Sequence, residues 1–228
     1  MTQDISPKDP RPYHHGDLHR AIVEAALDVL SESQSTEFSL RELARRAGVS
    51  HNAPYKHFAD KRELLAAVSA VGFELLAKRM AEATKELDSP RERLAAMARA
   101  YVSGGVNNPA LYRLMFGGYL GSQEDGRPAI ERTAANNMKA LVVEAICDGA
   151  LGRLIPDTAA NTRKIDGAIL IFWSHMHGLT LLLVDRLVGP SDKMEELTEG
   201  VLQGMLDGLA NCIPEIPAGV WVGPPAPE

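Results

Sequence analysis

The sequence predicts an all-α protein of about nine helices, in which a small N-terminal helix-turn-helix head precedes a larger helical body. Three observations predict this class. Apolar residues recur at helical spacing along nearly the whole chain, and no run alternates as a half-buried strand would. Helix start and stop signals crowd into the segment from residue 38 to 65. The 228 residues are 45% hydrophobic and 24% charged, which suits a soluble protein with a substantial core.

The chain begins with a polar, proline-containing arm, residues 1–15, which has no apolar stretch of the kind that a secretory signal requires. Its basic residues, among them Lys8 and Arg11, could contact DNA, but a disordered arm is the expectation that we carry forward. The first helix is predicted from about Asp17 to Ser33, because apolar residues line one of its sides.

A short second helix follows with a complete set of start signals. Ser39 is its predicted N-cap and Glu42 stands at N3, as in a capping box. Phe38 and Leu43 occupy the two positions of a hydrophobic staple. Gly48 stands where the helix should end, since glycine favours the left-handed turn found there.

The third helix is predicted from about His51 to Phe58, with Ser50 as its N-cap. Its side chains are mostly polar and suit contacts with bases or phosphates. Pro54 stands near the fourth position, so we expect a tightened or bent first turn. The interpretation is a helix-turn-helix with a recognition helix, and the alternative is a plain helical hairpin with solvated charges.

The net charge of −6 argues at first against a polyanion as partner. The segment from Ser39 to Leu64 departs from this average. It contains six basic and three acidic side chains, which gives a local net charge of +3. Phosphate contact depends on the local patch more than on the total charge.

The remaining sequence predicts six further helices and a proline-rich tail. The helices are expected at about Lys61–Leu87, Pro90–Gly104, Pro109–Tyr119, Ile130–Leu151, Ala159–Leu187 and Ser191–Cys212. The expected organisation is an arm at 1–15, a head at 16–62, a helical body at 63–212 and a tail at 213–228. Cys147 and Cys212 lack CxxC spacing, so neither a disulfide framework nor a zinc site is expected.

The run from Ala168 to Val184 is the most apolar of the chain and has no formal charge. A transmembrane helix has this hydropathy. The run is short, however, and it contains Ser174 and His175, while no second span exists. A helix buried on both sides is therefore the interpretation.

The last predicted helix carries Gly200, Gly204 and Gly208 at four-residue spacing, beside an apolar seam. Each glycine costs a helix about 0.8–1 kcal/mol relative to alanine. Close approach of another helix can offset this cost. The residues alone leave open whether that helix belongs to the same subunit or to a partner.

The head resembles the DNA-binding signature of the tetracycline-repressor (TetR) family of bacterial regulators, over roughly residues 13–70. The matching residues are Tyr13-His14-His15-Gly16-Asp17-Leu18, Leu43-Ala44, Ala47-Gly48-Val49-Ser50, Tyr55, Phe58, Asp60-Lys61 and Leu64-Leu65. Pro54 departs from the aliphatic residue that is commonest in the family. The segment Trp173–Gly178 resembles a Trp…His-Gly feature in the C-terminal domain of one subgroup.

The resemblance implies a homodimeric, cytoplasmic transcriptional regulator, in the simplest case a repressor of a palindromic operator that a small-molecule effector releases. Its implied partners are double-stranded DNA, a second copy and the effector, with no cofactor, metal or membrane. The expected DNA-binding residues are Arg41, Ser50, His51, Asn52, Tyr55, Lys56, His57 and Lys61. The expected ligand-binding residues are Met97, Tyr101, Met115, Phe116, Tyr119, Phe172, Trp173, Met176 and His177. The expected dimer interface holds Leu197, Gly200, Val201, Gly204, Met205 and Gly208.

Two other functions remain as alternatives. One is a helical ligand carrier or partner-binding protein without operator activity. The other is an enzyme, which the motifs do not favour, because the sequence holds no GxSxG elbow, HExxH pair, Walker loop or dinucleotide-binding GxGxxG.

Overall fold

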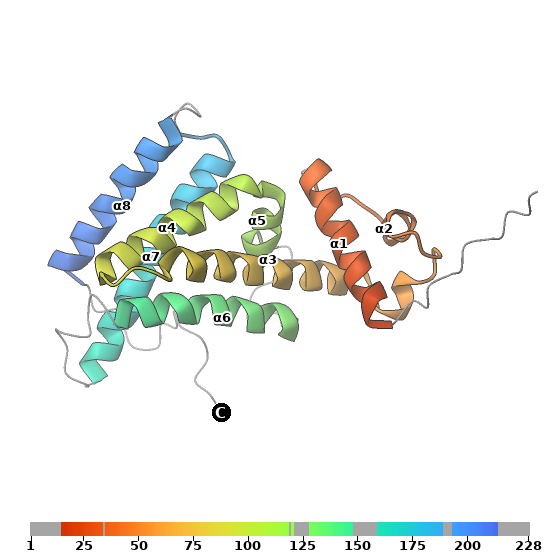
Figure 1. Ribbon diagram of the computed structural model, residues 1–228, viewed down its shortest axis with the longest axis horizontal. Helices are drawn as coiled ribbons and strands as arrows, with labels where there is room; N and C mark the ends of the chain where they lie inside the picture. Colours follow the sequence, from red (N-terminus) through yellow and green to blue (C-terminus); the bar gives the residue numbers. More distant parts are fainter. Residues whose placement is uncertain are drawn as a thin grey trace, which may run out of the picture. The chain divides into compact units, whose positions relative to one another are not determined.

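The computed structural model describes residues 15–33, 35–118, 120, 128–147, 159–188 and 193–213 (Figure 1). These residues form eight α-helices and one 3-10 helix, and no strand occurs among them, which confirms the all-α class. The chain divides into two compact units, Met1–Leu64 and Leu65–Glu228. Nearly all of the predicted arm and tail, the loop at 121–127 and Tyr119 lie outside the described residues.

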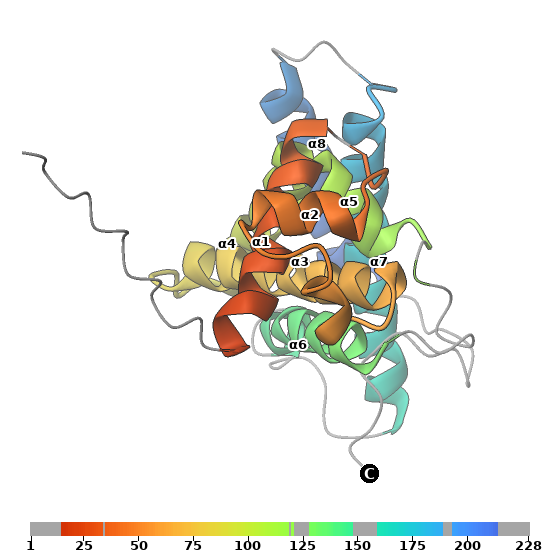
Figure 2. The same ribbon diagram turned by 90° about the vertical axis from the view of Figure 1, so that its right-hand side faces the viewer.

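The first unit is built from short helices around a small core. Its elements are α1 (His15–Ser33), α2 (Leu40–Arg46), the 3-10 helix η1 (Pro54–Lys56) and the first turn of α3 (Lys61–Thr84). Helix α1 packs against α2, and α2 packs against η1 (Figure 2). Ile22, Leu30, Leu43 and Phe58 meet in the core, and none of them is more than 2% exposed.

The predicted N-cap of α2 is confirmed, and a similar cap begins α3. The Ser39 hydroxyl accepts a hydrogen bond from the Glu42 N–H at 3.2 Å, as an N-cap should. At the start of α3, the Glu63 N–H donates to the Asp60 carboxylate at 2.8 Å. The Ala59 N–H in turn donates to the Glu63 carboxylate at 2.6 Å. Ser39 and Asp60 therefore fix where the two helices begin.

Gly48 ends α2 in the left-handed region, with φ of +67°, and a Cβ added there would meet no atom within 4 Å. Only backbone conformation therefore opposes a side chain at this position. We expect Gly48→Ala to lower the free energy of unfolding by about 1–2 kcal/mol. Gly48→Asn should cost less, because asparagine tolerates this region. Urea denaturation checks both variants, and equal losses would contradict the conformational cause.

The predicted recognition helix is wrong in extent. In place of a helix over His51–Phe58, only η1 forms, and the Ala53 N–H bonds to the Ser50 carbonyl at 2.9 Å in a turn. Pro54 is the cause, because its ring nitrogen has no hydrogen to donate to the carbonyl of Ser50, four residues earlier. Pro54 is nevertheless buried, so its ring fills space in the head as an aliphatic side chain would.

The second unit contains the rest of α3 and five further helices. They are α4 (Pro90–Asn107), α5 (Pro109–Phe116), α6 (Ala129–Ile146), α7 (Ala159–Val184) and α8 (Met194–Asn211). Helix α4 contacts α5, α6, α7 and α8, and α7 also packs against α6 and α8 (Figure 1). Their apolar faces share one core, in which Phe73, Met80, Leu94, Phe172 and Met176 lie buried. All six helices predicted after the head are present.

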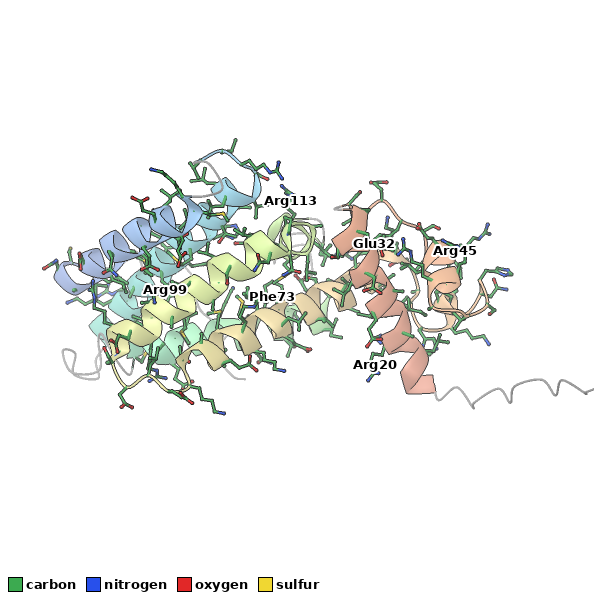
Figure 3. The ribbon with its side chains drawn as sticks, turned by 45° about the horizontal axis from the view of Figure 1, so that its top comes forward. Arg20, Glu32, Arg45, Phe73, Arg99 and Arg113 are labelled. Carbon is green, nitrogen blue, oxygen red and sulfur yellow. The ribbon has the colours of Figure 1, made fainter. Side chains whose placement is uncertain are left out.

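Ion pairs tie the helices of this unit together at their exposed edges. Arg99 on α4 makes two hydrogen bonds to the Glu199 carboxylate on α8 (Figure 3). This guanidinium lowers the pKa of Glu199. Arg113 on α5 lies 2.6 Å from the Asp185 carboxylate, just beyond the end of α7. The pairs are partly exposed, so they orient the helices more than they stabilise the fold.

The apolar run noted in the sequence belongs to α7. Residues Arg163–Val184 are long and apolar enough to cross a membrane by length and composition alone, and 44% of the most apolar window is buried. Leu170 and Leu182 remain 39% and 40% exposed. Helix α7 therefore has one face in the core and carries apolar side chains on an outward face.

Candidate nucleic-acid interface and ligand cavities

Six of the eight expected DNA-binding residues are exposed in the first unit. They are Arg41, Ser50, His51, Asn52, Tyr55 and Lys56. Tyr55 is 53% exposed, although tyrosine usually buries its ring. A phenol beside cationic and amide side chains can donate to phosphates and to base edges. We call these six residues the polar head surface.

The other two expected residues make contacts inside the first unit. The Lys61 ammonium donates to the Thr36 carbonyl at 2.7 Å and lies 5.0 Å from the centre of the Phe38 ring. The half-buried His57 ring lies edge-on to the His19 ring, with 6.3 Å between the ring centres. These contacts hold the start of α3 and the end of η1 against the core of the head.

Arg45 is a surface cation that the expected set omitted. Figure 3 shows it on α2, where it is exposed. It follows Arg41 by four residues, so the two guanidiniums share one face of the helix. The neighbouring Arg46 instead pairs with Glu32 at 2.7 Å. The four-residue spacing in the sequence is the signal that could have identified Arg45.

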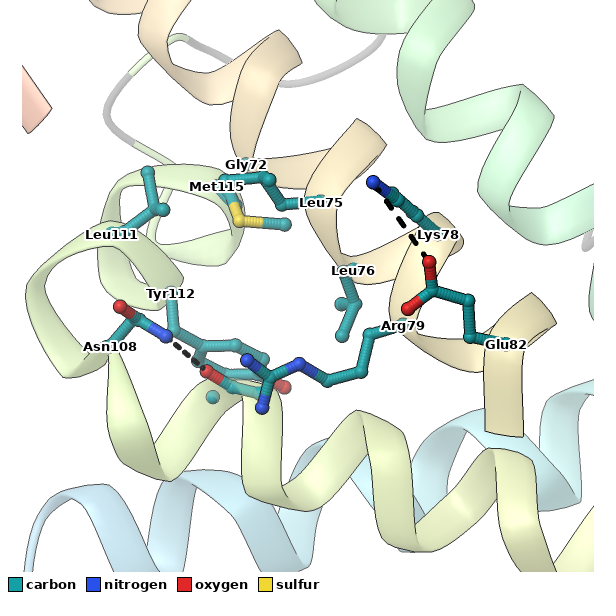
Figure 4. A pocket seen from close by; sticks show the side chains of 12 residues that line it. Gly72, Leu75, Leu76, Lys78, Arg79, Glu82, Asn108, Leu111, Tyr112 and Met115 are labelled. Atoms are coloured by element: carbon teal, nitrogen blue, oxygen red, sulfur yellow. Dashed lines mark hydrogen bonds and ion pairs between the residues drawn. The ribbon is translucent and has the colours of Figure 1, made fainter. Parts of the chain in front are cut away.

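A cavity of about 340 Å³ lies among α3, α4 and α5 (Figure 4). Its wall includes Gly72, Leu76, Tyr112 and the expected ligand residue Met115. At its rim Lys78 lies 3.9 Å from the Glu82 carboxylate. We call this space the α5 cavity.

A second cavity, of about 440 Å³, lies among α3, α5, α6 and α7, and we call it the aromatic cavity. Its described lining is Phe73, Phe116, Arg132, Ala135, Asn136, Lys139, Leu170, Trp173, Ser174 and His177. Three expected ligand residues, Phe116, Trp173 and His177, thus come together here. The structure gathers them from α5 and α7, which are distant in the sequence.

Four other expected ligand residues line neither cavity. Met97, Tyr101, Phe172 and Met176 lie in the core of the second unit, each 3% exposed or less. A stripe of methionine and aromatic residues at helical spacing is equally the pattern of an ordinary core face. A third cavity, of about 580 Å³, lies beside the Arg99–Glu199 pair and is lined by none of the expected residues.

His177 connects the aromatic cavity to two buried phenols. Its Nδ1 lies 2.6 Å from the Tyr112 hydroxyl, which lies 3.0 Å from the Tyr101 hydroxyl. Burial raises the pKa of both tyrosines, and it lowers the pKa of His177. The imidazole is therefore neutral at neutral pH and hydrogen-bonded on one side by a phenol.

Two cations in the aromatic cavity were not expected from the sequence. Arg132 and Lys139 come from α6, and the Lys139 ammonium lies 4.8 Å from the centre of the Trp173 ring. With Asn136 they form a polar stripe at spacings of four and three residues, on one helix face. Such a stripe is usually a solvated surface, so its spacing alone could not identify a cavity wall.

The expected interface residues on α8 divide into two groups. Gly200, Gly204 and Gly208 are exposed, and a Cβ added at any of them would meet no atom within 4 Å. Leu197 and Val201 are half-buried beside them. Met205 is only 2% exposed and packs in the core of its own subunit. The glycines therefore leave an open strip on α8.

Comparisons with known proteins match both units of the chain. Residues 22–68 match the family model described as bacterial regulatory proteins, tetR family. Residues 94–205 match the model described as tetracyclin repressor-like, C-terminal domain. An uncharacterized HTH-type transcriptional regulator of Haemophilus influenzae is 32% identical over 115 residues. That match spans 50% of this chain and 56% of the Haemophilus protein, about half of each.

Solved structures share the fold over most of the chain. A protein with unknown function from Rhodococcus sp. RHA1 is 30% identical, with a TM-score of 0.72 over 89% of this chain and 100% of that one. The transcriptional regulator FadR from Bacillus subtilis, in complex with stearoyl-CoA, is 17% identical. Its TM-score is 0.60, over 83% of this chain and 98% of that one.

Proposed function

The chain belongs to the tetracycline-repressor (TetR) family of bacterial regulators, and from this we propose that it is a cytoplasmic homodimer that represses a palindromic operator until an effector binds. In this proposal it is a regulator and not an enzyme. The observation that carries the proposal is the polar head surface. Its exposed cations, amide and phenol belong to a chain whose net charge is −6, so the acidic excess lies elsewhere.

Dimerisation would use the outward faces of α7 and α8. The open glycine strip of α8 allows a partner helix to approach closely, and α7 adds the exposed apolar side chains Leu170 and Leu182. A two-fold axis would then present two copies of the head to half-sites about one helical turn, or a multiple, apart. The operator should accordingly be palindromic.

The effector would act through α3. This helix begins at Lys61, whose ammonium holds the Thr36 carbonyl of the head, and it continues unbroken to Thr84. Phe73, on the same helix, lines the aromatic cavity. A ligand that shifts Phe73 would bias the one helix that both units share. Coupling of about 1–3 kcal/mol is typical of such switches and corresponds to roughly 5- to 150-fold in affinity.

The Bacillus subtilis regulator with this fold was solved in complex with stearoyl-CoA, which supports a ligand site in the second unit of this chain. The aromatic cavity supports an effector of mixed character for this chain, because rings and charged side chains share its wall. We assign the effector to this cavity, since it gathers residues from four helices of the second unit, α3 included.

Loss of phosphate contacts tests the proposed function. The full chain and its Arg41→Ala and Lys56→Ala variants would be titrated by fluorescence anisotropy with DNA that flanks its own gene, over a range of salt concentrations. Each substitution removes two phosphate contacts per dimer. The plot of log affinity against log salt concentration should therefore become shallower by about 1.8 for each variant.

The matched control is Lys85→Ala, which removes an exposed cation from the second unit and should leave the salt dependence unchanged. Weak, sequence-independent binding by the unsubstituted chain would overturn the operator proposal and favour a carrier. Equal effects of all three substitutions would show that DNA does not contact the polar head surface.

A further inference from the structure

The hydrogen bonds of His177 indicate the chemical class of the ligand that the aromatic cavity takes. We propose that the effector is an uncharged carbonyl compound with a flat apolar body, and that its carbonyl oxygen accepts a hydrogen bond from His177 Nε2. This inference rests on the proposed function only in calling the ligand an effector. The binding chemistry itself follows from the contacts of His177.

Three polar atoms meet at the buried side of the His177 ring. The Tyr112 hydroxyl lies 2.6 Å from His177 Nδ1, the Tyr101 hydroxyl lies 3.4 Å from the same nitrogen, and the two hydroxyls are 3.0 Å apart. Each hydroxyl carries one hydrogen. When Nδ1 is bare, Tyr101 donates to Tyr112 and Tyr112 donates to Nδ1, so both hydrogens have an acceptor.

A hydrogen on Nδ1 would not fit this arrangement. A protonated Nδ1 accepts no hydrogen bond, and only one hydrogen can lie between the two hydroxyl oxygens. One phenol hydrogen would then have no acceptor among the three atoms, which is costly because Tyr101 and Tyr112 are each only 2% exposed. The Trp173 indole N–H, which can only donate, interacts with the Tyr101 hydroxyl and favours the same direction of donation. The imidazole is therefore neutral, with its hydrogen on Nε2.

The second ring nitrogen of His177 is the one that a ligand can reach. His177 lines the aromatic cavity, and it makes no further hydrogen bond with the residues that the structure describes. Its Nε2 is not one of the enclosed polar atoms of the described residues that lack a partner, so this nitrogen is accessible. Since Nδ1 contacts the phenols, Nε2 points away from them. Its N–H is therefore a donor that a molecule in the cavity can use.

The same arrangement favours a neutral acceptor over an anion. A carboxylate binds best to a protonated imidazole, and His177 cannot take up a second proton without placing it on Nδ1, against the Tyr112 hydroxyl. Both cations of the cavity wall, Arg132 and Lys139, already interact with other groups of the protein. A ketone, ester or amide oxygen accepts from Nε2–H without bringing a charge out of water.

The apolar part of the ligand follows from the ring walls. The Phe116 ring lies 4.9 Å from that of His177 and the Trp173 ring 6.2 Å from it, measured between ring centres. Phe73 packs edge-to-face on Phe116, with 5.2 Å between their centres. A molecule whose carbonyl reaches Nε2 is therefore flanked by rings, and a cavity of about 440 Å³ suits a flat apolar body.

Two fluorescent probes test the inference on the full chain. Propionyl(dimethylamino)naphthalene carries a ketone, and in its propyl counterpart a methylene replaces the carbonyl. His177→Phe keeps a ring and removes the donor, so it should weaken the ketone probe about 5- to 10-fold and change the affinity of the propyl probe less than about 2-fold. The bound ketone should also emit at longer wavelength with the unsubstituted chain than with His177→Phe, because a hydrogen bond stabilises its excited state, which carries more charge on the ketone oxygen.

His175→Phe is the matched control. It makes the same chemical change on α7 at an exposed histidine, whose Nδ1 lies 2.8 Å from the Ile171 carbonyl of its own helix, and it should affect neither probe. Tyr112→Phe removes the hydroxyl that donates to His177 Nδ1, which frees the ring hydrogen to move there. It should weaken the ketone probe about 2- to 5-fold and leave the propyl probe unchanged, which also shows that the cavity is folded.

The nitrogen NMR shifts of the His177 ring in the unsubstituted chain report the tautomer directly and should place the hydrogen on Nε2. A hydrogen on Nδ1, equal weakening of the two probes in both His177→Phe and Tyr112→Phe, or no binding of either probe overturns the inference. Tighter binding of the matching naphthoate, in which a carboxylate replaces the ketone, overturns the uncharged class. Failure of the regulator proposal is read separately, from the DNA titration, so the two outcomes are distinguishable.

Discussion

Gly204→Arg should convert the protein to monomers and lower its operator affinity by about 10²- to 10⁴-fold. Two linked heads bind two half-sites with an effective local concentration that one head alone lacks, and this factor is lost when the dimer dissociates. Gly204 is exposed on α8, and a Cβ there would meet no atom within 4 Å of its own subunit. The arginine should therefore fit the isolated subunit and clash only with a partner helix.

Sedimentation at several concentrations gives the mass, and anisotropy with palindromic DNA gives the affinity. Ala140→Arg is the control, because it adds the same side chain to an exposed position on α6. Gly204→Ala refines the comparison. It should raise the stability of the subunit by about 0.8–1 kcal/mol through helix propensity and still weaken the dimer. A dimer that survives Gly204→Arg with full operator affinity would show that the glycine strip faces solvent.

In the head, local sequence signals predict where helices begin and end. Ser39, Gly48 and Asp60 act within a few residues of themselves, and each does in the structure what its residue type predicts. The recognition helix was predicted too long for an equally local reason. We expected Pro54 to tighten or bend the first turn, but only a short 3-10 helix forms there. The role of Lys61 was different, because its partners, Thr36 and Phe38, are distant in the sequence.

The aromatic cavity could be predicted only in part, because its walls come from four helices. Trp173 and His177 share a helix face, so their joint presence follows from spacing. Whether Tyr101 lines a cavity or fills the core depends on how α4 packs on its neighbours, which periodicity does not determine. Lys139 was not among the expected residues. A charge at helical spacing usually belongs to a solvated surface, and only the packing of α6 makes Lys139 part of the cavity wall.

Two neighbouring glycines of α4 show why that packing matters. A Cβ added at Gly105 would lie 2.3 Å from Thr180 Cγ2 and 2.8 Å from the Tyr112 ring. Both neighbours are held firmly, Thr180 by a 2.6 Å hydrogen bond to the Met176 carbonyl and Tyr112 by its contact with His177. A Cβ added at Gly104 would instead lie 2.7 Å from Leu76 Cδ1, the end of a flexible side chain.

Gly105→Ala should therefore lower the free energy of unfolding by about 2 kcal/mol, because overpacking outweighs the gain in helix propensity. Gly104→Ala makes the same chemical change one residue earlier, so it should be neutral or stabilising by up to about 1 kcal/mol. Urea denaturation of both variants measures the difference. Equal stability of the two variants would mean that α4 packs less closely against α5 and α7 than the structure shows.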